Sequence, residues 1–203
     1  MKANLKSHWE NVYKTKTPQE VSWTQKTPTA SLELIQSFSL SKKAKIIDVG
    51  GGDSNLVDHL LENGYENITV LDISAKAIES AKIRLGTKAE KVNWIVCDIL
   101  DFKPNTTFDI WHDRAAFHFL TTNEQTSKYI DLVSRYVENY LVLGTFSKNG
   151  PQKCSGLEIK QYSEETLTNK FKSNFNKIAC FTEDHMTPFK TTQNFLFCSF
   201  KKV

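Results

Sequence analysis

The stretch KIIDVGGGDSNLVDHL, residues 45–60, constrains the fold of this chain more than any other segment. A short apolar run ends in three consecutive glycines, Gly50, Gly51 and Gly52, and apolar residues at helical spacing follow them. Glycine permits unusual backbone dihedrals and lets the backbone approach a ligand, because it has no Cβ. The pattern predicts a buried strand, a tight turn and a helix, with the turn as a candidate ligand site.

The rest of the chain repeats this alternation of strand and helix. We expect strands at 44–49, 67–73, 91–99, 108–113 and 139–146, and helices at 4–14, 54–63, 74–86 and 123–138. A further helix is expected after Thr27, with Pro28 at its first position. Strands that alternate with helices are typical of right-handed βαβ units and of a mostly parallel sheet.

The pattern changes after residue 146. We expect a loop through SKNGPQKCSGLEI, a helix over 164–172 capped by Ser163, and two closing strands, FNKIACFT and QNFLFCSF, that pair antiparallel. The turn between these strands is expected to hold His185. The predicted fold is a three-layer α/β sandwich with a seven-stranded, mostly parallel sheet and an antiparallel last strand. We expect one domain over 1–203.

Composition narrows the functional classes. The net charge is only +3 and the longest basic runs are pairs of lysines, so we expect no nucleic-acid partner. No stretch approaches the ~18 apolar residues of a membrane span, and the first residues show no apolar core of a signal peptide. The four cysteines are widely spaced without a CxxC pair. We therefore expect no metal site, no disulfide framework and a reduced, cytoplasmic protein.

Acidic residues stand at the ends of three successive predicted strands: Asp48, Asp72 and Asp98. A carboxylate at the end of the second strand can accept both ribose hydroxyls of a nucleoside. A dinucleotide would require GxGxxG, but Asn55 stands where the third glycine would fall, and Asp53 would repel a pyrophosphate. S-adenosylmethionine has no phosphate, and its ammonium group suits an acidic rim.

The loop DVGGGDS resembles the DxGxGxG loop of class I S-adenosylmethionine-dependent methyltransferases, with Ser54 in place of the usual third glycine. LDIS at 71–74 and CDI at 97–99 resemble two further motifs of that family. The resemblance implies a Rossmann-like methyltransferase fold, with Asp72 on the ribose, Asp98 and Ile99 beside the adenine, and the glycines against the methionine. The candidate cofactor-binding set is Asp48, Gly50, Gly51, Gly52, Asp72, Ile73, Asp98, Ile99, His112, Trp9, Tyr13 and Trp23.

The segment FDIWHDRAAFHFL follows the fourth strand and supplies the candidate catalytic residues Asp113, Arg114 and His118. Cys154 and His185 are further candidates on the substrate side. Each has a structural alternative: Asp113 as a helix cap, Arg114 as the partner of a surface acid, His118 as a core histidine. WHDRAAFHF is similar to the WDRGA stretch of thiopurine and other thiol methyltransferases. It is also similar to the corresponding stretch of small protein-lysine methyltransferases, which share the Trp-x-x-x-Tyr pattern of HWENVY.

Three aromatic residues, Trp9, Tyr13 and Trp23, predict a lid within residues 1–27, because aromatic faces attract a sulfonium. We therefore expect a methyltransferase that acts on a small-molecule acceptor, with a thiol or another soft nucleophile as one candidate. The alternatives are a protein-lysine methyltransferase, a non-catalytic S-adenosylmethionine-binding domain, and a nicotinamide-dependent oxidoreductase.

Overall fold

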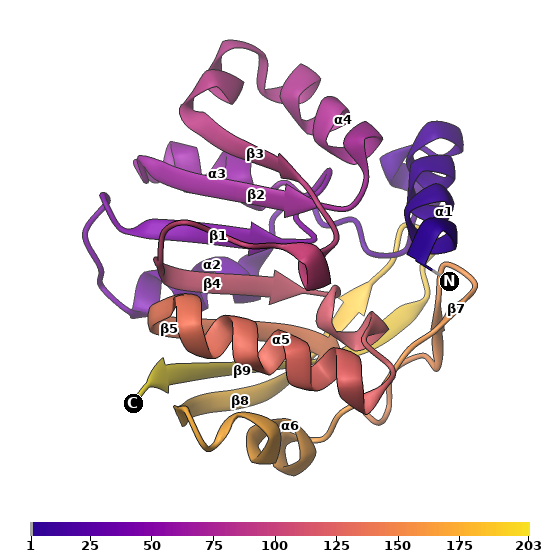
Figure 1. The fold of residues 1–203 in the computed structure, drawn as a ribbon. Helices are drawn as coiled ribbons and strands as arrows, with labels where there is room; N and C mark the ends of the chain where they lie inside the picture. The colour runs from indigo at the N-terminus through magenta and orange to yellow at the C-terminus, as the bar shows by residue number, and fades with distance from the viewer. Residues whose placement is uncertain (1) are drawn as a thin grey trace.

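The computed structural model describes residues 2–203, with side chains from Leu5 onward, and one seven-stranded sheet forms its centre (Figure 1). The strands are β1 (Lys45–Val49), β2 (Asn67–Asp72), β3 (Val92–Val96), β4 (Phe108–Arg114), β5 (Val137–Phe146), β8 (Phe175–Met186) and β9 (Thr192–Lys202). Their order across the sheet is β3-β2-β1-β4-β5-β9-β8. The first five strands pair in parallel, and β9 pairs antiparallel with both β5 and β8. The predicted fold class is confirmed.

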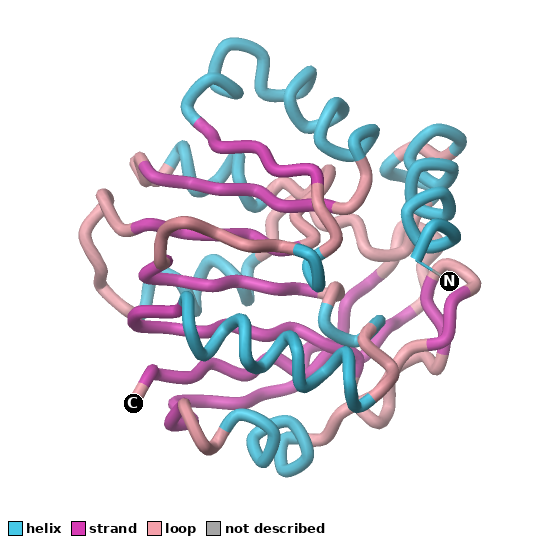
Figure 2. The backbone as a smooth tube through the Cα atoms, in the orientation of Figure 1, coloured by secondary structure: helices cyan, strands magenta, loops and turns pink. Residues whose placement is uncertain are grey.

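Helices cover both faces of the sheet (Figure 2). They are α2 (Thr29–Ser37), α3 (Leu56–Glu62), α4 (Ala75–Leu85), α5 (Asn123–Tyr136) and α6 (Glu164–Phe171), whereas α1 (Lys2–Thr15) lies beyond the carboxyl ends of the strands (Figure 1). Four 3₁₀ turns, Pro18–Glu20, Gly86–Lys91, Ile99–Asp101 and Phe117–Phe119, complete the connections. Among the described residues, no helix is both long and apolar enough to span a bilayer.

Among the described residues, the two largest of three buried apolar clusters lie on opposite faces of the sheet. On one face, α5 and α6 pack on β1, β4, β5 and β9 around Trp111, Tyr129 and Phe171. On the other face, α2, α3 and α4 pack on β1 to β4 around Ile46 and Leu60. Because the inner strands β1 and β2 are buried on both faces, they carry short apolar runs, and such runs made the alternation of strands and helices predictable from the sequence.

Three local expectations differ from the structure. The predicted loop after β5 contains a small hairpin, β6 (Lys153–Cys154) and β7 (Leu157–Glu158). Ser155 and Gly156 both have positive φ angles, as a two-residue type I′ hairpin turn requires. β8 runs to Met186, so His185 lies inside a strand rather than in the turn. Finally, α2 begins at Thr29 with Pro28 as its N-cap residue, one position later than expected.

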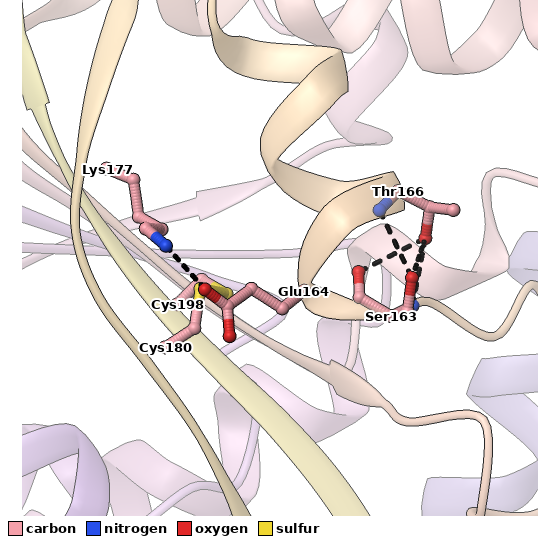
Figure 3. The surroundings of a disulfide bond; sticks show 6 residues. All are labelled: Ser163, Glu164, Thr166, Lys177, Cys180 and Cys198. Carbon is pink, nitrogen blue, oxygen red and sulfur yellow. Dashed lines mark hydrogen bonds and ion pairs between the residues drawn. A yellow bond between two sulfur atoms is a disulfide. The ribbon is translucent and has the colours of Figure 1, made fainter.

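Cysteine pairing also differs from the expectation. Cys180 on β8 and Cys198 on β9 stand opposite each other in the strand register and form a disulfide, beside the ion pair of Lys177 and Glu164 (Figure 3). Side chains of directly opposed residues share a face of the sheet and meet. Spacing in the sequence could not reveal this, because it depends on the register of β8 against β9. The expectation of a reduced protein without a disulfide framework is therefore wrong for this pair of cysteines.

Candidate active site

A cavity opens at the carboxyl ends of β1, β2, β3 and β4, and it is also lined by residues of α1 and of the segment that follows it. Most of the candidate residues line it: Trp9, Tyr13, Trp23, Asp48, Gly50, Gly51, Asp72, Ile73, Asp98, Ile99, His112, Arg114 and Cys154. Gly52, Asp113, His118 and His185 do not line it. The fold thus gathers residues from four separate strand ends at one place, as parallel sheets do.

The glycine turn is built for close approach. Gly50 has a φ of +69°, and a Cβ there would lie 2.8 Å from the Cβ of Ala116. A Cβ on Gly51 would lie 2.5 Å from the Asp48 carboxylate oxygen Oδ2. The backbone N–H of Gly50 donates to the carbonyl oxygen of Leu71 at 2.8 Å, which ties the turn to β2. Neighbouring atoms of the protein leave no room for a side chain at Gly50 or Gly51, so backbone atoms form the cavity wall at this turn.

Asp48 and His112 form a buried pair between β1 and β4. His112 Nδ1 and Asp48 Oδ1 are 2.7 Å apart, and His112 Nε2 lies 2.8 Å from the hydroxyl of Ser31 on α2. Both ring nitrogens of His112 are therefore engaged. Asp48 Oδ2 is buried and has no hydrogen-bond partner among the described residues. This orphaned oxygen is an acceptor suited to an ammonium group in the cavity.

Two more carboxylates line the cavity on the β2 and β3 side. Asp72 is 5% exposed, and its Oδ1 accepts from the backbone N–H of Ser74 at 2.8 Å. Burial raises the pKa of Asp72 to about 7, and the nearby charges of Asp48 and Glu10 act in the same direction. Asp98 lies two residues beyond β3 and caps the 3₁₀ turn through the N–H of Leu100.

Aromatic rings form the roof. The ring centroid of Trp9 on α1 lies 5.6 Å from that of Trp23, 6.2 Å from that of Tyr13 and 5.2 Å from that of Phe119. Glu10, on the same helix, accepts from the N–H groups of Ala75 and Lys76 and from the Ser74 hydroxyl, at 2.8–3.1 Å. A carboxylate at the start of α4 meets its free N–H groups and its positive dipole end. The roof is thus attached to the rest of the fold by a helix cap.

The segment Ser22–Gln25 continues this roof. His185 Nε2 lies 2.7 Å from the carbonyl oxygen of Ser22, and Gln25 Nε2 lies 3.3 Å from Glu183 on β8. Asn55 donates to the carbonyl oxygen of Gln25 at 2.8 Å from the opposite side of the cavity. The segment therefore bridges β8 and the start of α3, and His185 supports it.

The residues after β4 divide into two kinds. Asp113 accepts from the N–H groups of Ala116 and Phe117 and from the hydroxyl of Tyr129, which shapes the turn below the cavity. His118 is fully buried and stacks on Phe146 with ring centroids 4.7 Å apart. Burial lowers the pKa of His118 to about 3, so its ring is neutral.

Arg114 and Cys154 line the cavity beside these residues. Burial lowers the pKa of Arg114 to about 10 and raises the pKa of the Cys154 thiol to about 12. At neutral pH the guanidinium is therefore charged, whereas the thiol is protonated. Among the described residues, no group of His, Cys, Asp and Glu is arranged to hold a metal ion.

Sequence reasoning missed Glu10, Ser31 and Gln25. Glu10 directly follows Trp9 within a predicted helix, and Ser31 occupies an ordinary helical position. Their partners are 64 to 158 residues away in the chain. Only the tertiary packing of α1, α2 and the segment between them reveals these contacts, and no local signal could have found them.

Comparisons with known proteins agree with this architecture. Residues 46–139 match the family model described as methyltransferase domain. The eEF1A lysine and N-terminal methyltransferase of Mus musculus is 24% identical over 140 residues, which are 68% of this chain and 20% of that protein. EEF1A lysine methyltransferase 2 of Mus musculus is 26% identical over 150 residues, 66% of this chain and 61% of that protein. The chain thus spans about a fifth of the first of these relatives and less than two thirds of the second.

Solved structures share the fold. The Burkholderia thailandensis 1,6-didemethyltoxoflavin-N1-methyltransferase, solved with 1,6-didemethyltoxoflavin and S-adenosylhomocysteine, has a TM-score of 0.72 at 16% identity and covers 99% of this chain and 88% of its own. A protein from work on the conversion of a disulfide bond into a thioacetal group during echinomycin biosynthesis has a TM-score of 0.77 at 17% identity, covering 97% and 92%. At these identities the likeness establishes the architecture.

Proposed function

The chain carries a class I, S-adenosylmethionine-dependent methyltransferase domain, and we propose that it transfers the methyl group to a soft nucleophile, such as a thiol, on a small molecule. The observation that carries this proposal is the character of the cavity. It is roofed by aromatic side chains, and the one histidine among its described lining residues has both ring nitrogens hydrogen bonded.

The cofactor fits the residues present. The orphaned Asp48 Oδ2 suits the ammonium of the methionine part, and Asp72 suits the ribose hydroxyls. Asp98 and Ile99 flank the place proposed for the adenine, against the glycine turn and Ile73. When bound, S-adenosylmethionine supplies an electrophilic methyl group on a sulfonium. The rings of Trp9, Tyr13 and Trp23 would stabilise that positive charge and exclude water.

The preference for a soft nucleophile follows from which groups could remove a proton from the acceptor. An amine or a hydroxyl must lose a proton before or during transfer, and a positioned base accelerates that step. His112, the one histidine among the described lining residues, has both ring nitrogens hydrogen bonded to Asp48 and Ser31. A thiol, with an ordinary pKa of about 8.5, gives up its proton more readily than a hydroxyl or an alkylammonium and depends less on a positioned base. The chain's own work is then orientation, which can contribute on the order of 7–11 kcal/mol.

A protein-lysine acceptor is the second candidate. It is favoured by the similarity to two eEF1A lysine methyltransferases and by the aromatic lining of the cavity. Two features count against it. The roof is attached to α4 through Glu10 and to β8 through Gln25 and His185, and these contacts oppose the opening that a protein surface would need. The charged guanidinium of Arg114 lines the cavity and would repel an approaching ammonium.

Two measurements test the proposal. Isothermal titration with S-adenosylmethionine and S-adenosylhomocysteine, with NAD as the control, should give micromolar binding of the first two alone. Methyl transfer is then followed by mass spectrometry with small thiols, with small amines and with a cell lysate. Transfer to thiols supports the proposal. Transfer only to lysate protein would favour the lysine alternative, and cofactor binding without any transfer would indicate a non-catalytic domain.

A further inference from the structure

Arg114 is a charged side chain at the cavity whose hydrogen-bonding capacity is mostly unused. Its Nη1 donates to the carbonyl oxygen of Trp23 at 3.1 Å. Its Nε and Nη2 are closed off from water and have no hydrogen-bond partner among the described residues. A buried guanidinium in this condition is costly to the fold, because its lost hydration is not replaced. The methyl-transfer step proposed above makes no use of this charge beyond favouring ionisation nearby.

The two unpartnered nitrogens point to a particular ligand geometry. Nε–H and the adjacent Nη2–H lie along one edge of the planar guanidinium and run nearly parallel, which matches the two oxygens of a carboxylate. The opposite end is already fixed by the Trp23 carbonyl oxygen. We propose that this edge of Arg114 binds a carboxylate carried by the methyl acceptor. The inference rests on the proposed function and narrows its substrate class to small anionic molecules.

The direction of the side chain separates this carboxylate from that of the cofactor. A Cβ on Gly144 of β5 would lie 3.2 Å from Arg114 Cγ, and the guanidinium lies over the Phe195 ring of β9 at 4.5 Å. The side chain therefore extends toward β5 and β9. The glycine turn and Asp72 lie on the other side of β4, toward β1 and β2. The charge is thus on the side of the cavity left over for the acceptor.

The neighbours of Arg114 leave its charge available. The thiol of Cys154 and the ring of His118 are both neutral at pH 7, because burial raises the pKa of the first and lowers the pKa of the second. Glu183 on β8 and Asp48 on β1 are the nearby carboxylates; Glu183 Oε1 is engaged by Gln25 Nε2, and Asp48 Oδ1 is engaged by His112 Nδ1. No carboxylate of the described residues lies within ion-pair distance of Arg114. An acceptor carboxylate would supply the missing counter-charge.

The test is an equilibrium titration that does not depend on turnover. Phenylacetate and its uncharged analogue phenylacetamide are titrated into the protein with and without S-adenosylhomocysteine. Wild type should bind phenylacetate at least about tenfold more tightly than the amide, since a charge-assisted bidentate pair is the strong kind of hydrogen bond. Arg114→Gln should weaken phenylacetate binding on the order of 10- to 100-fold, and Arg114→Lys, which keeps the charge without the fork, by less.

Lys153→Gln is the matched control, because Lys153 is an exposed cation on the neighbouring β6, paired outside the cavity with Glu158. It should leave phenylacetate binding unchanged. The proposal is overturned if wild type does not prefer phenylacetate, if Arg114→Gln binds it as wild type does, or if Arg114→Gln weakens only S-adenosylhomocysteine. Absence of S-adenosylhomocysteine binding to wild type would count against the proposed function instead, and the cofactor-free titration would still decide the role of Arg114.

Discussion

Binding of the cofactor should release a proton from Asp72. Burial, with help from Asp48 and Glu10, raises the pKa of this carboxyl to about 7. The ionised form accepts hydrogen bonds from the two ribose hydroxyls in the proposed site, whereas the protonated form loses acceptor capacity. Affinity for S-adenosylhomocysteine should therefore fall as the pH drops below 7, toward tenfold per pH unit well below the pKa, and by roughly tenfold between pH 8 and pH 6.

Calorimetry measures this directly. Titrations in two buffers with different ionisation enthalpies count the protons released on binding, which should approach one at pH 6 and roughly a tenth at pH 8. Asp72→Asn should bind on the order of 10- to 100-fold more weakly at pH 8, because a charged acceptor is lost. It should also show no change in affinity between pH 6 and pH 8.

Asp98→Asn is the matched control at the neighbouring strand end, and it should retain the proton release. Equal affinity of wild type at pH 6 and pH 8, with no proton released, would refute the reasoning. The same conclusion would follow if Asp72→Asn kept the pH dependence of wild type.

Asp72→Asn, which should weaken cofactor binding, should in contrast raise the stability of the fold at high pH. Because the folded pKa of Asp72 lies above the unfolded value, its contribution to stability is fully present below about pH 4 and is lost as the pH rises through 7. Three pKa units correspond to at most about 4 kcal/mol. Urea unfolding should show Asp72→Asn to be more stable than wild type at pH 8 and equal to it at pH 4, without cofactor. A variant less stable at pH 8 would contradict the assigned pKa.

Three further predictions concern the turn, the roof and the disulfide. Gly51→Ala should abolish measurable S-adenosylhomocysteine binding, because its Cβ would lie 2.5 Å from Asp48 Oδ2; calorimetry that finds wild-type affinity would disprove the clash. Glu10→Ala should weaken the attachment of α1 by about 1–2 kcal/mol and speed hydrogen exchange in residues 5–15. Unchanged exchange would show that other contacts hold the helix without Glu10. Reducing Cys180–Cys198, which closes a loop of 18 residues, should cost up to about 3 kcal/mol of unfolding free energy while leaving cofactor affinity unchanged in the same titration.

Local pattern was sufficient for most of the fold. Buried parallel strands are apolar runs, and the caps at Ser74 and Ser163 and the stop at Gly86 mark helix ends through contacts within a few residues. The order of acids along the chain also predicted their shared edge, because all parallel strands end on one side of a sheet. Hence Asp48, Asp72 and Asp98 were predicted to meet, and they do line one cavity.

Register and side-chain direction were decided only by the tertiary structure. The pairing of β8 with β9 opposes Cys180 and Cys198 and draws His185 into a strand, and neither follows from residue spacing. Within FDIWHDRAAFHFL, neighbouring side chains leave the backbone in different directions. Arg114 therefore lines the cavity, whereas Asp113 bonds the turn and His118 stacks in the core.

The sequence by itself determined the class of fold and the edge of the sheet where we propose that the cofactor binds, because those depend on hydrophobic periodicity and strand direction. It could not determine which polar groups find hydrogen-bond partners in the folded protein. Those contacts join segments far apart in the chain, such as Glu10 with the start of α4 and His112 with Ser31. The unpartnered edge of Arg114, from which we infer an anionic acceptor, is visible only once all its neighbours are in place.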